Sequence, residues 1–233
     1  MLCLLVALGF YLSETKAQNN IYKVFVKSEW LQYHDSLNFN FGSNKKFVKD
    51  FELQALIALS YYPELKNVPI TFKYQDIRTT MEVRPEYFSA LKHSNRKYIV
   101  FIDTNTHNES VLLKDVSFNA QVGVIGHELA HIIDFENRSL KSLILLALRY
   151  TILNNHAKYE RSIDQLTIDR GLGWQTLEFA DFMQNKSKAS VKYKKFKLAN
   201  YLSDIEIQVE IAKMKLYSSF GSPKKLNNSV SGK

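Results

Sequence analysis

The segment Asn119–Glu136 constrains the fold of this chain most strongly, because its residues fit a long helix with two unlike faces. His127 and His131 stand four positions apart in it. Residues at that spacing lie about 40° apart around a helix and one turn apart along it, so both imidazoles can reach one metal ion. Apolar residues form a stripe on the side away from the histidines; they are Val122, Ile125, Leu129, Ile132 and Ile133. We expect the helix to bury this stripe and to present the histidines to a cleft.

Glu128 follows the first histidine directly and completes the order His-Glu-Leu-Ala-His. Its side chain is turned by about 100° from that of His127, which places it beside the open coordination position of a metal and outside the ligand set. Zn²⁺ lowers the pKa of a bound water from about 15.7 to roughly 7, and a neighbouring carboxylate can take its proton and pass it to a leaving amine. The pattern predicts a zinc site with Glu128 as the catalytic base. Two surface histidines and a solvated Glu on an ordinary helix are the alternative.

The same segment resembles the zincin metallopeptidases, and among them the gluzincins, the thermolysin-like group whose third metal ligand is a Glu on a later helix. The downstream pattern of that group is Glu-x-x-x-Asp, and this chain has Glu160 followed by Asp164 four positions later. The resemblance implies that Glu160 is the third zinc ligand and that Asp164 hydrogen-bonds a ligand histidine and fixes its orientation. It also implies a zincin-like fold and a peptide or protein substrate. From the residues alone, Glu160 could also be a solvated carboxylate on a helix face.

Other residues compete for the third ligand position. Asp134 lies three residues after His131 on the same helix face, but it would need a distorted helix to reach the same ion. His156 and Asp169 are lesser candidates. The metzincin branch would need Gly at position 134 and His at position 137, where this chain has Asp134 and Asn137, so it is disfavoured. No oxyanion-stabilising residue can be assigned, although several polar side chains lie near in sequence: Tyr150, His156, Tyr159 and Arg170.

The rest of the chain predicts an α+β fold, with a mixed α/β first part and a helical second part. The predicted strands are Ile21–Lys27, Ile70–Ile77 and Tyr98–Asp103, with a short edge strand near Val111–Leu113. The predicted helices are Lys45–Tyr62, Asn119–Glu136, Leu140–Leu153, His156–Asp169, Leu177–Met183 and Leu198–Tyr217. We expect one zincin-like domain over residues 18–220. A small mixed sheet of its 18–137 lobe packs on the histidine-bearing helix, and its 138–220 lobe brings Glu160 across the cleft.

The run Leu143–Leu153 is apolar enough to be mistaken for a membrane span. It is too short to cross a hydrocarbon core of about 30 Å, and it carries Arg149 in its middle. We predict a helix of the protein core, with contact to a membrane surface as the alternative.

The N-terminus has the layout of a signal peptide. An apolar run, Leu2–Leu12, is followed by polar residues and then by Ala17, a small residue suited to cleavage. We expect residues 1–17 to be removed and the protein to be secreted or periplasmic, with a buried N-terminal helix as the alternative. Cys3, the only cysteine, lies within this segment. A mature chain without it can have no disulfide, no thiolate mechanism and no cysteine ligand for zinc.

The chain carries a formal net charge of +8 at pH 7, and much of that charge lies late in the sequence. Six lysines crowd one stretch: Lys186, Lys188, Lys192, Lys194, Lys195 and Lys197. One interpretation is a solvated helix face, followed by a mobile tail over residues 221–233. Contact with a polyanion or a membrane surface is the other interpretation, with nucleic acid disfavoured.

The alternative to a zinc enzyme is an exported binding or scaffold protein whose metal site is structural or vestigial.

Overall fold

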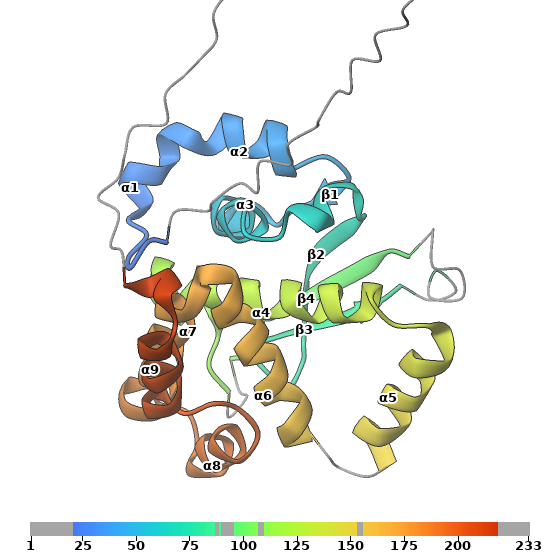
Figure 1. Cartoon of the computed structure of the whole chain (residues 1–233), viewed down its shortest axis with the longest axis vertical. Coiled ribbons are helices and arrows are strands. Elements are labelled where there is room, and N and C mark those ends of the chain that lie inside the picture. Colours follow the sequence, from blue (N-terminus) through green and yellow to red (C-terminus); the bar gives the residue numbers. More distant parts are fainter. Residues whose placement is uncertain (1–20, 87–88, 90–95, 107–109, 153–155, 219–233) are drawn as a thin grey trace, which may run out of the picture.

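The computed structural model describes residues 21–86, 89, 96–106, 110–152 and 156–218. The predicted signal peptide with Cys3 and the predicted tail at 221–233 lie outside these residues. Within them the protein has the α+β fold that the sequence predicts, because every strand lies at or before Asp103 and only helical elements follow (Figure 1). None of the helices in these ranges is both long and apolar enough to span a bilayer.

A four-stranded mixed sheet forms in the first part of the chain. Its strands are β1 (Lys45–Lys46), β2 (Ile70–Gln75), β3 (Met81–Pro85) and β4 (Tyr98–Asp103), in the order β1-β2-β4-β3. β2 and β4 run parallel with Ile70 opposite Tyr98, whereas β3 runs antiparallel to β4. Since β3 is the last strand of the sheet, one of its backbone edges has no strand partner in the described part of the chain.

Helix α4 (Phe118–Glu136) crosses the middle of the molecule (Figure 1) and confirms the predicted helix. It begins after Ser117, whose side-chain oxygen accepts a hydrogen bond from a backbone N–H of the first turn. At the other end, the buried guanidinium of Arg96 donates to the carbonyl oxygens of Phe135 and Arg138, at 2.6 and 2.9 Å. These bonds tie the segment before β4 to the end of α4 and to the turn that follows it.

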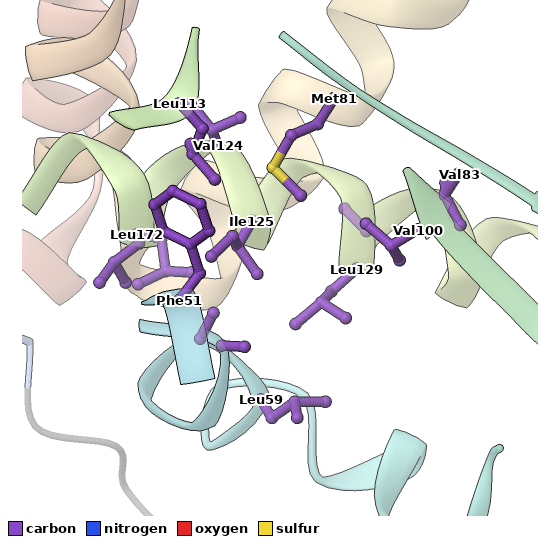
Figure 2. Close-up of a cluster of buried hydrophobic side chains, with 14 of the residues drawn as sticks. Phe51, Leu59, Met81, Val83, Val100, Leu113, Val124, Ile125, Leu129 and Leu172 are labelled. Carbon is purple, nitrogen blue, oxygen red and sulfur yellow. The ribbon is translucent and has the colours of Figure 1, made fainter. Parts of the chain in front are cut away.

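The predicted apolar stripe of α4 lies in the core, since its residues are no more than 6% exposed. Figure 2 shows Ile125 and Leu129 of this stripe among side chains from α3 (Glu52–Leu59), the sheet and the turn after α6. The opposite side of α4 is covered by helices α6 and α7. α4 is therefore buried on all sides, which rigidly fixes the side chains it carries.

The N-terminal segment is where a strand prediction is wrong. Residues Ile21–Lys27 form no strand; the chain is irregular until the short helix α1 (Lys27–Trp30), which precedes α2 (His34–Phe41). The buried ring of Phe25 lies 5.0 Å from that of Trp30 and 6.1 Å from that of Tyr61, centroid to centroid. The apolar residues of this segment are thus used in aromatic packing on the body of the protein, and strand pairing is not needed to bury them.

Near the sheet, the strands Ile70–Ile77 and Tyr98–Asp103 are confirmed, but other predictions fail. Val111–Leu113 is not a strand; it leads into a 3-10 turn at Leu113–Asp115. Only the second part of the predicted helix Lys45–Tyr62 is α-helical, as α3. β3 was not predicted because its sequence is charged and ends in proline, and only pairing with a distant strand creates it.

The second part of the described chain folds as α6 (His156–Thr167), α7 (Gly173–Asp181), α8 (Val191–Asn200) and α9 (Asp204–Lys213). Gly171, at φ 100°, turns the chain between α6 and α7 in a conformation that favours glycine. The predicted single helix Leu198–Tyr217 is wrong, because the chain breaks after Asn200. Ser203 and Glu206 then form a capping box that starts α9.

Helix α5 (Leu140–Ile152) is present, but its predicted place in the core is wrong. Ile144, Leu145 and Leu148 are 52, 46 and 46% exposed, and no described side chain of the helix is buried. Helical spacing of apolar residues reports an apolar face, but it does not report whether another element covers that face.

Gly123 allows α4 and α7 to approach each other closely. A Cβ atom on Gly123 would lie 2.5 Å from the backbone carbonyl carbon of Gln175 in α7. Helix propensity alone would make Gly123→Ala stabilising by about 1 kcal/mol. We expect the clash to prevail and to lower the free energy of unfolding by about 1–3 kcal/mol, measured by urea denaturation.

Gly126→Ala is the comparison, because the one close contact of its Cβ would be with the flexible side chain of Leu172, at 2.4 Å. It should cost less stability than Gly123→Ala. A Gly123→Ala variant as stable as the wild type would contradict the close helix contact.

Candidate metal centre

Helices α4 and α6 pack together and bring the three predicted ligands to one point. α4 supplies His127 and His131, and α6 supplies Glu160. The Nε2 atoms of His127 and His131 lie 3.2 and 3.5 Å from Oε2 of Glu160. One potential ligand atom from each residue lies within 4.8 Å of the other two.

Asp164 lies one turn beyond Glu160 on α6 and holds His127 on its other side. Nδ1–H of His127 donates to Oδ1 of Asp164 at 2.8 Å, and the second carboxylate oxygen accepts from the backbone N–H of Leu202 at 2.9 Å. A carboxylate can only accept hydrogen bonds, so a ring proton lies on Nδ1. In the neutral imidazole, Nε2 then keeps the lone pair that faces Glu160.

His131 is oriented through Tyr159. The hydroxyl of Tyr159 donates to Asp134 at 3.0 Å, so its oxygen accepts the hydrogen bond from Nδ1–H of His131, at 3.2 Å. Asp134 is held in turn by the guanidinium of Arg138, at 2.6 and 2.9 Å. This chain of contacts leaves Nε2 of His131 with its lone pair toward Glu160, as in His127.

The arrangement of these donor atoms fits a zinc ion. Two imidazole lone pairs and a carboxylate oxygen face one point, and such groups repel one another unless a cation, either a proton or a metal, lies between them. In a tetrahedron with zinc–ligand bonds of about 2.0–2.1 Å, neighbouring ligand atoms are roughly 3.3–3.4 Å apart. The distances of 3.2 and 3.5 Å from Glu160 to the two histidines agree with this spacing.

The electrostatics of the cluster show the same demand for positive charge. Burial by itself would lower the pKa of His127, but the hydrogen bonds to Asp164 and Glu160 and their negative charges raise it to about 10. Burial would raise the pKa of Glu160, but the hydrogen bonds and charges of His127 and His131 hold it well below its usual range. The carboxylate is therefore strongly stabilised in its ionised form.

Glu128 lies on the neighbouring side of α4 and borders a pocket together with His127 and Asp164. The pocket is partly open to solvent. Burial raises the pKa of Glu128, and the positive charges of His131 and His127 offset part of the rise. A carboxylate with a raised pKa takes up a proton more readily, which suits a general base.

The site is less open than the sequence predicts. His127, His131 and Glu160 are only 9, 8 and 2% exposed, so the ligand face of α4 lies under α6 and does not border a wide cleft. The predicted separation into a buried stripe and an exposed polar face therefore fails for this helix. α6 covers His127 and His131 because it supplies the third ligand, Glu160, and therefore packs against them.

The competing ligand candidates lie outside the cluster. Asp134 binds Arg138 and Tyr159, and Asp169 is exposed and accepts a hydrogen bond from Gln165 at 2.9 Å. Neither of these residues nor His156 belongs to the group of potential metal ligands found among the described residues.

The structure also shows where most candidates for the oxyanion-stabilising role lie. Tyr159 contacts His131 and Asp134, and Arg170 forms an ion pair with Glu64 at 2.7 Å. The side chain of Tyr150 lies outside the described residues, and His156 does not line the pocket beside Glu128.

The sequence did not predict that two further residues lie at the site. The ring of Tyr201 lies 5.7 Å from that of His127, centroid to centroid, and Lys197 lines the same pocket as Glu128. They come from α8 and the turn after it, and α8 contacts α6, the helix of Glu160, although the two are far apart along the chain. No local pattern marks them, and Lys197 was hidden in the run of lysines.

No protein-family model, no curated protein and no solved structure matches this chain. The resemblance to zincins therefore stays a prediction that rests on the chain's own residues.

The geometry predicts one zinc ion per chain, bound by His127, His131 and Glu160. Glu160→Gln removes the charged ligand and should lower zinc affinity more than about 100-fold. That is the upper limit typical of substituting a residue that only hydrogen-bonds a metal ligand. Glu210→Gln, the same change at a carboxylate that pairs with Lys213 on α9, is the matched control and should bind zinc within a few-fold of the wild type. Equal losses in both variants, measured by calorimetry and metal analysis, would contradict the ligand set.

Asp164 has a separate test, because it holds His127 without facing the metal point. Asp164→Asn keeps the shape and removes the charge, and should weaken zinc binding about 10- to 100-fold. Asp169→Asn, further along the same stretch of chain, should change nothing. Unchanged zinc affinity in Asp164→Asn would show that Asp164 does not orient the histidine.

Proposed function

We propose that this protein is a zinc-dependent hydrolase, a metallopeptidase of the gluzincin type with a zincin-like fold. The observation that supports it most is the convergence of three lone-pair donors, His127, His131 and Glu160, beside the buried carboxyl group of Glu128. Three protein ligands leave one position of a tetrahedral zinc ion for water, as catalytic sites do, whereas structural sites are closed by a fourth protein ligand.

Each residue then has a role that its contacts support. His127, His131 and Glu160 hold the metal, and Asp164 and Tyr159 fix the two imidazoles. A bound zinc ion would polarise the substrate carbonyl and make a water molecule more acidic. Glu128 would accept a proton from the attacking water and deliver it to the leaving amine.

The edge strand β3 supports a peptide as the substrate. Its first residue, Met81, and the preceding Thr79 and Thr80 line the pocket that Glu128 borders. An extended peptide could add, through backbone hydrogen bonds, to the edge of β3 that carries no strand among the described residues, and thereby pass Glu128. A strand edge recognises a peptide backbone of any sequence, so it fits a peptidase better than a small-molecule hydrolase.

The rival is an exported protein whose metal site is structural, and the burial of the cluster favours it. In that case Glu128 would be a buried carboxyl without a catalytic task. Export itself rests on the sequence of residues 1–17 and is proposed on that ground.

Glu128→Gln separates the two functions. The zinc content should stay at one ion per chain, while hydrolysis of a fluorogenic peptide library should fall about 10²- to 10⁴-fold, because a general base contributes on that order. Glu210→Gln, at a carboxylate that pairs with Lys213 and does not line the pocket, should retain full activity. Wild-type protein that binds zinc but cleaves no peptide, or cleavage that survives phenanthroline, would count against the peptidase.

A further inference from the structure

Lys197 differs from the other lysines of its basic run. Lys192 and Lys195 on the same helix, α8, are exposed, whereas Lys197 is 8% exposed and lines the pocket beside Glu128. Its Nζ atom lies 3.4 Å from the ring centroid of Tyr201 and 5.9 Å from that of Phe179. The run therefore does not form one solvated face; one of its charges is turned into the protein.

This ammonium group has no counter-ion among the described residues. It forms no ion pair with a carboxylate there, and its charge reaches Glu128 only at a distance. Cation–π contacts stabilise this ammonium group, but they do not replace a charged hydrogen-bond partner. Lysine is almost never buried unless it is paired.

The pocket around Lys197 is mainly apolar. Val124, Phe179, Met183 and Ile207 contribute to its walls, and it extends from the side of Glu128 toward α8. Tyr201 lies between the two ends, because its ring contacts both Lys197 and His127. A group that enters from the metal centre would thus cross an apolar space before it meets a positive charge.

We infer that this pocket binds an acidic group of the substrate, in which an apolar stem fills the pocket and a carboxylate accepts hydrogen bonds from Nζ of Lys197. The carboxylate comes either from a Glu-like side chain or from the C-terminus of the peptide. The inference deepens the proposed peptidase function and rests on it for the identity of the ligand as a substrate.

A binding experiment tests the pocket without requiring hydrolysis. The probes are 4-phenylbutanoate and its neutral amide, titrated by calorimetry into the full chain, both zinc-loaded and after chelation. We expect the carboxylate to bind at least about ten-fold more tightly than the amide, as charge-assisted hydrogen bonds do. The preference for the acid over the amide should persist after zinc is chelated. If the carboxylate bound zinc instead of Lys197, chelation would abolish the preference.

Lys197→Met removes the charge at nearly equal volume and should abolish the preference, whereas Lys197→Arg should keep most of it. Lys195→Met, on the exposed side of the same helix, is the matched control and should behave as the wild type. Circular dichroism and urea unfolding check that each variant is folded. We expect no loss of stability in Lys197→Met, because no ion pair is removed.

Peptides then separate the two sources of the carboxylate. In the wild type, KM should rise at least about ten-fold either when a C-terminal carboxylate is amidated or when a Glu is replaced by Gln. Lys197→Met should lose that difference. A change in the pH profile of kcat without a change in carboxylate preference would overturn the inference and assign Lys197 to the tuning of Glu128.

The two proposals fail separately. Lys197-dependent binding of phenylbutanoate without zinc or hydrolysis would support the pocket and refute the peptidase. Zinc-dependent hydrolysis with equal binding of acid and amide would support the peptidase and refute the pocket.

Discussion

The mutual repulsion of three lone-pair groups between α4 and α6 is the constraint on which this structure depends. His127, His131 and Glu160 are buried at one point, where water cannot screen them. Each imidazole is fixed from behind, His127 by Asp164 and His131 by Tyr159, so neither ring can turn its lone pair away without losing a hydrogen bond. A buried arrangement of this kind is stable only with a cation at its centre. A proton held by the cluster or a bound metal ion would supply this positive charge, and the proposed chemistry uses the metal.

The rest of the helical part serves to bring α6 onto α4. Gly171 reverses the chain between α6 and α7, and Gly123 lets the backbone of α7 lie directly against α4. The loop before α9 then returns to the centre, where the backbone N–H of Leu202 donates to Asp164. Helices that are far apart in the chain are therefore linked to the orientation of one imidazole. A packing error in any of them would be transmitted to the metal point.

Features that depend on the sequence of one helix alone could be predicted for α4. The spacing of His127 and His131, the position of Glu128 and the buried stripe of α4 are all local, and helical periodicity is enough to read them. Glu160 and Asp164 needed the resemblance to a family, because only the fold places α6 opposite α4. The contacts that Tyr159, Lys197 and Tyr201 make at the site could not be predicted, although Tyr159 and Lys197 were noted in the sequence, because no local pattern records such contacts. β3 and the exposure of α5 were missed for the same reason. β3 depends on a distant partner strand, and the exposure of α5 depends on which of the described residues pack against it.

The burial of the centre also bears on how a substrate reaches it. α6 covers the ligands, so access is left on the side of Glu128, where the pocket runs between the start of β3 and α8. An extended chain that lay along β3 would place a carbonyl near Glu128 and direct an adjoining group toward Lys197. Recognition and reaction would then use opposite ends of the same pocket. Such a division allows binding energy from a remote group to position the reacting bond, which explains why a charge would be kept in an apolar space at the expense of its hydration.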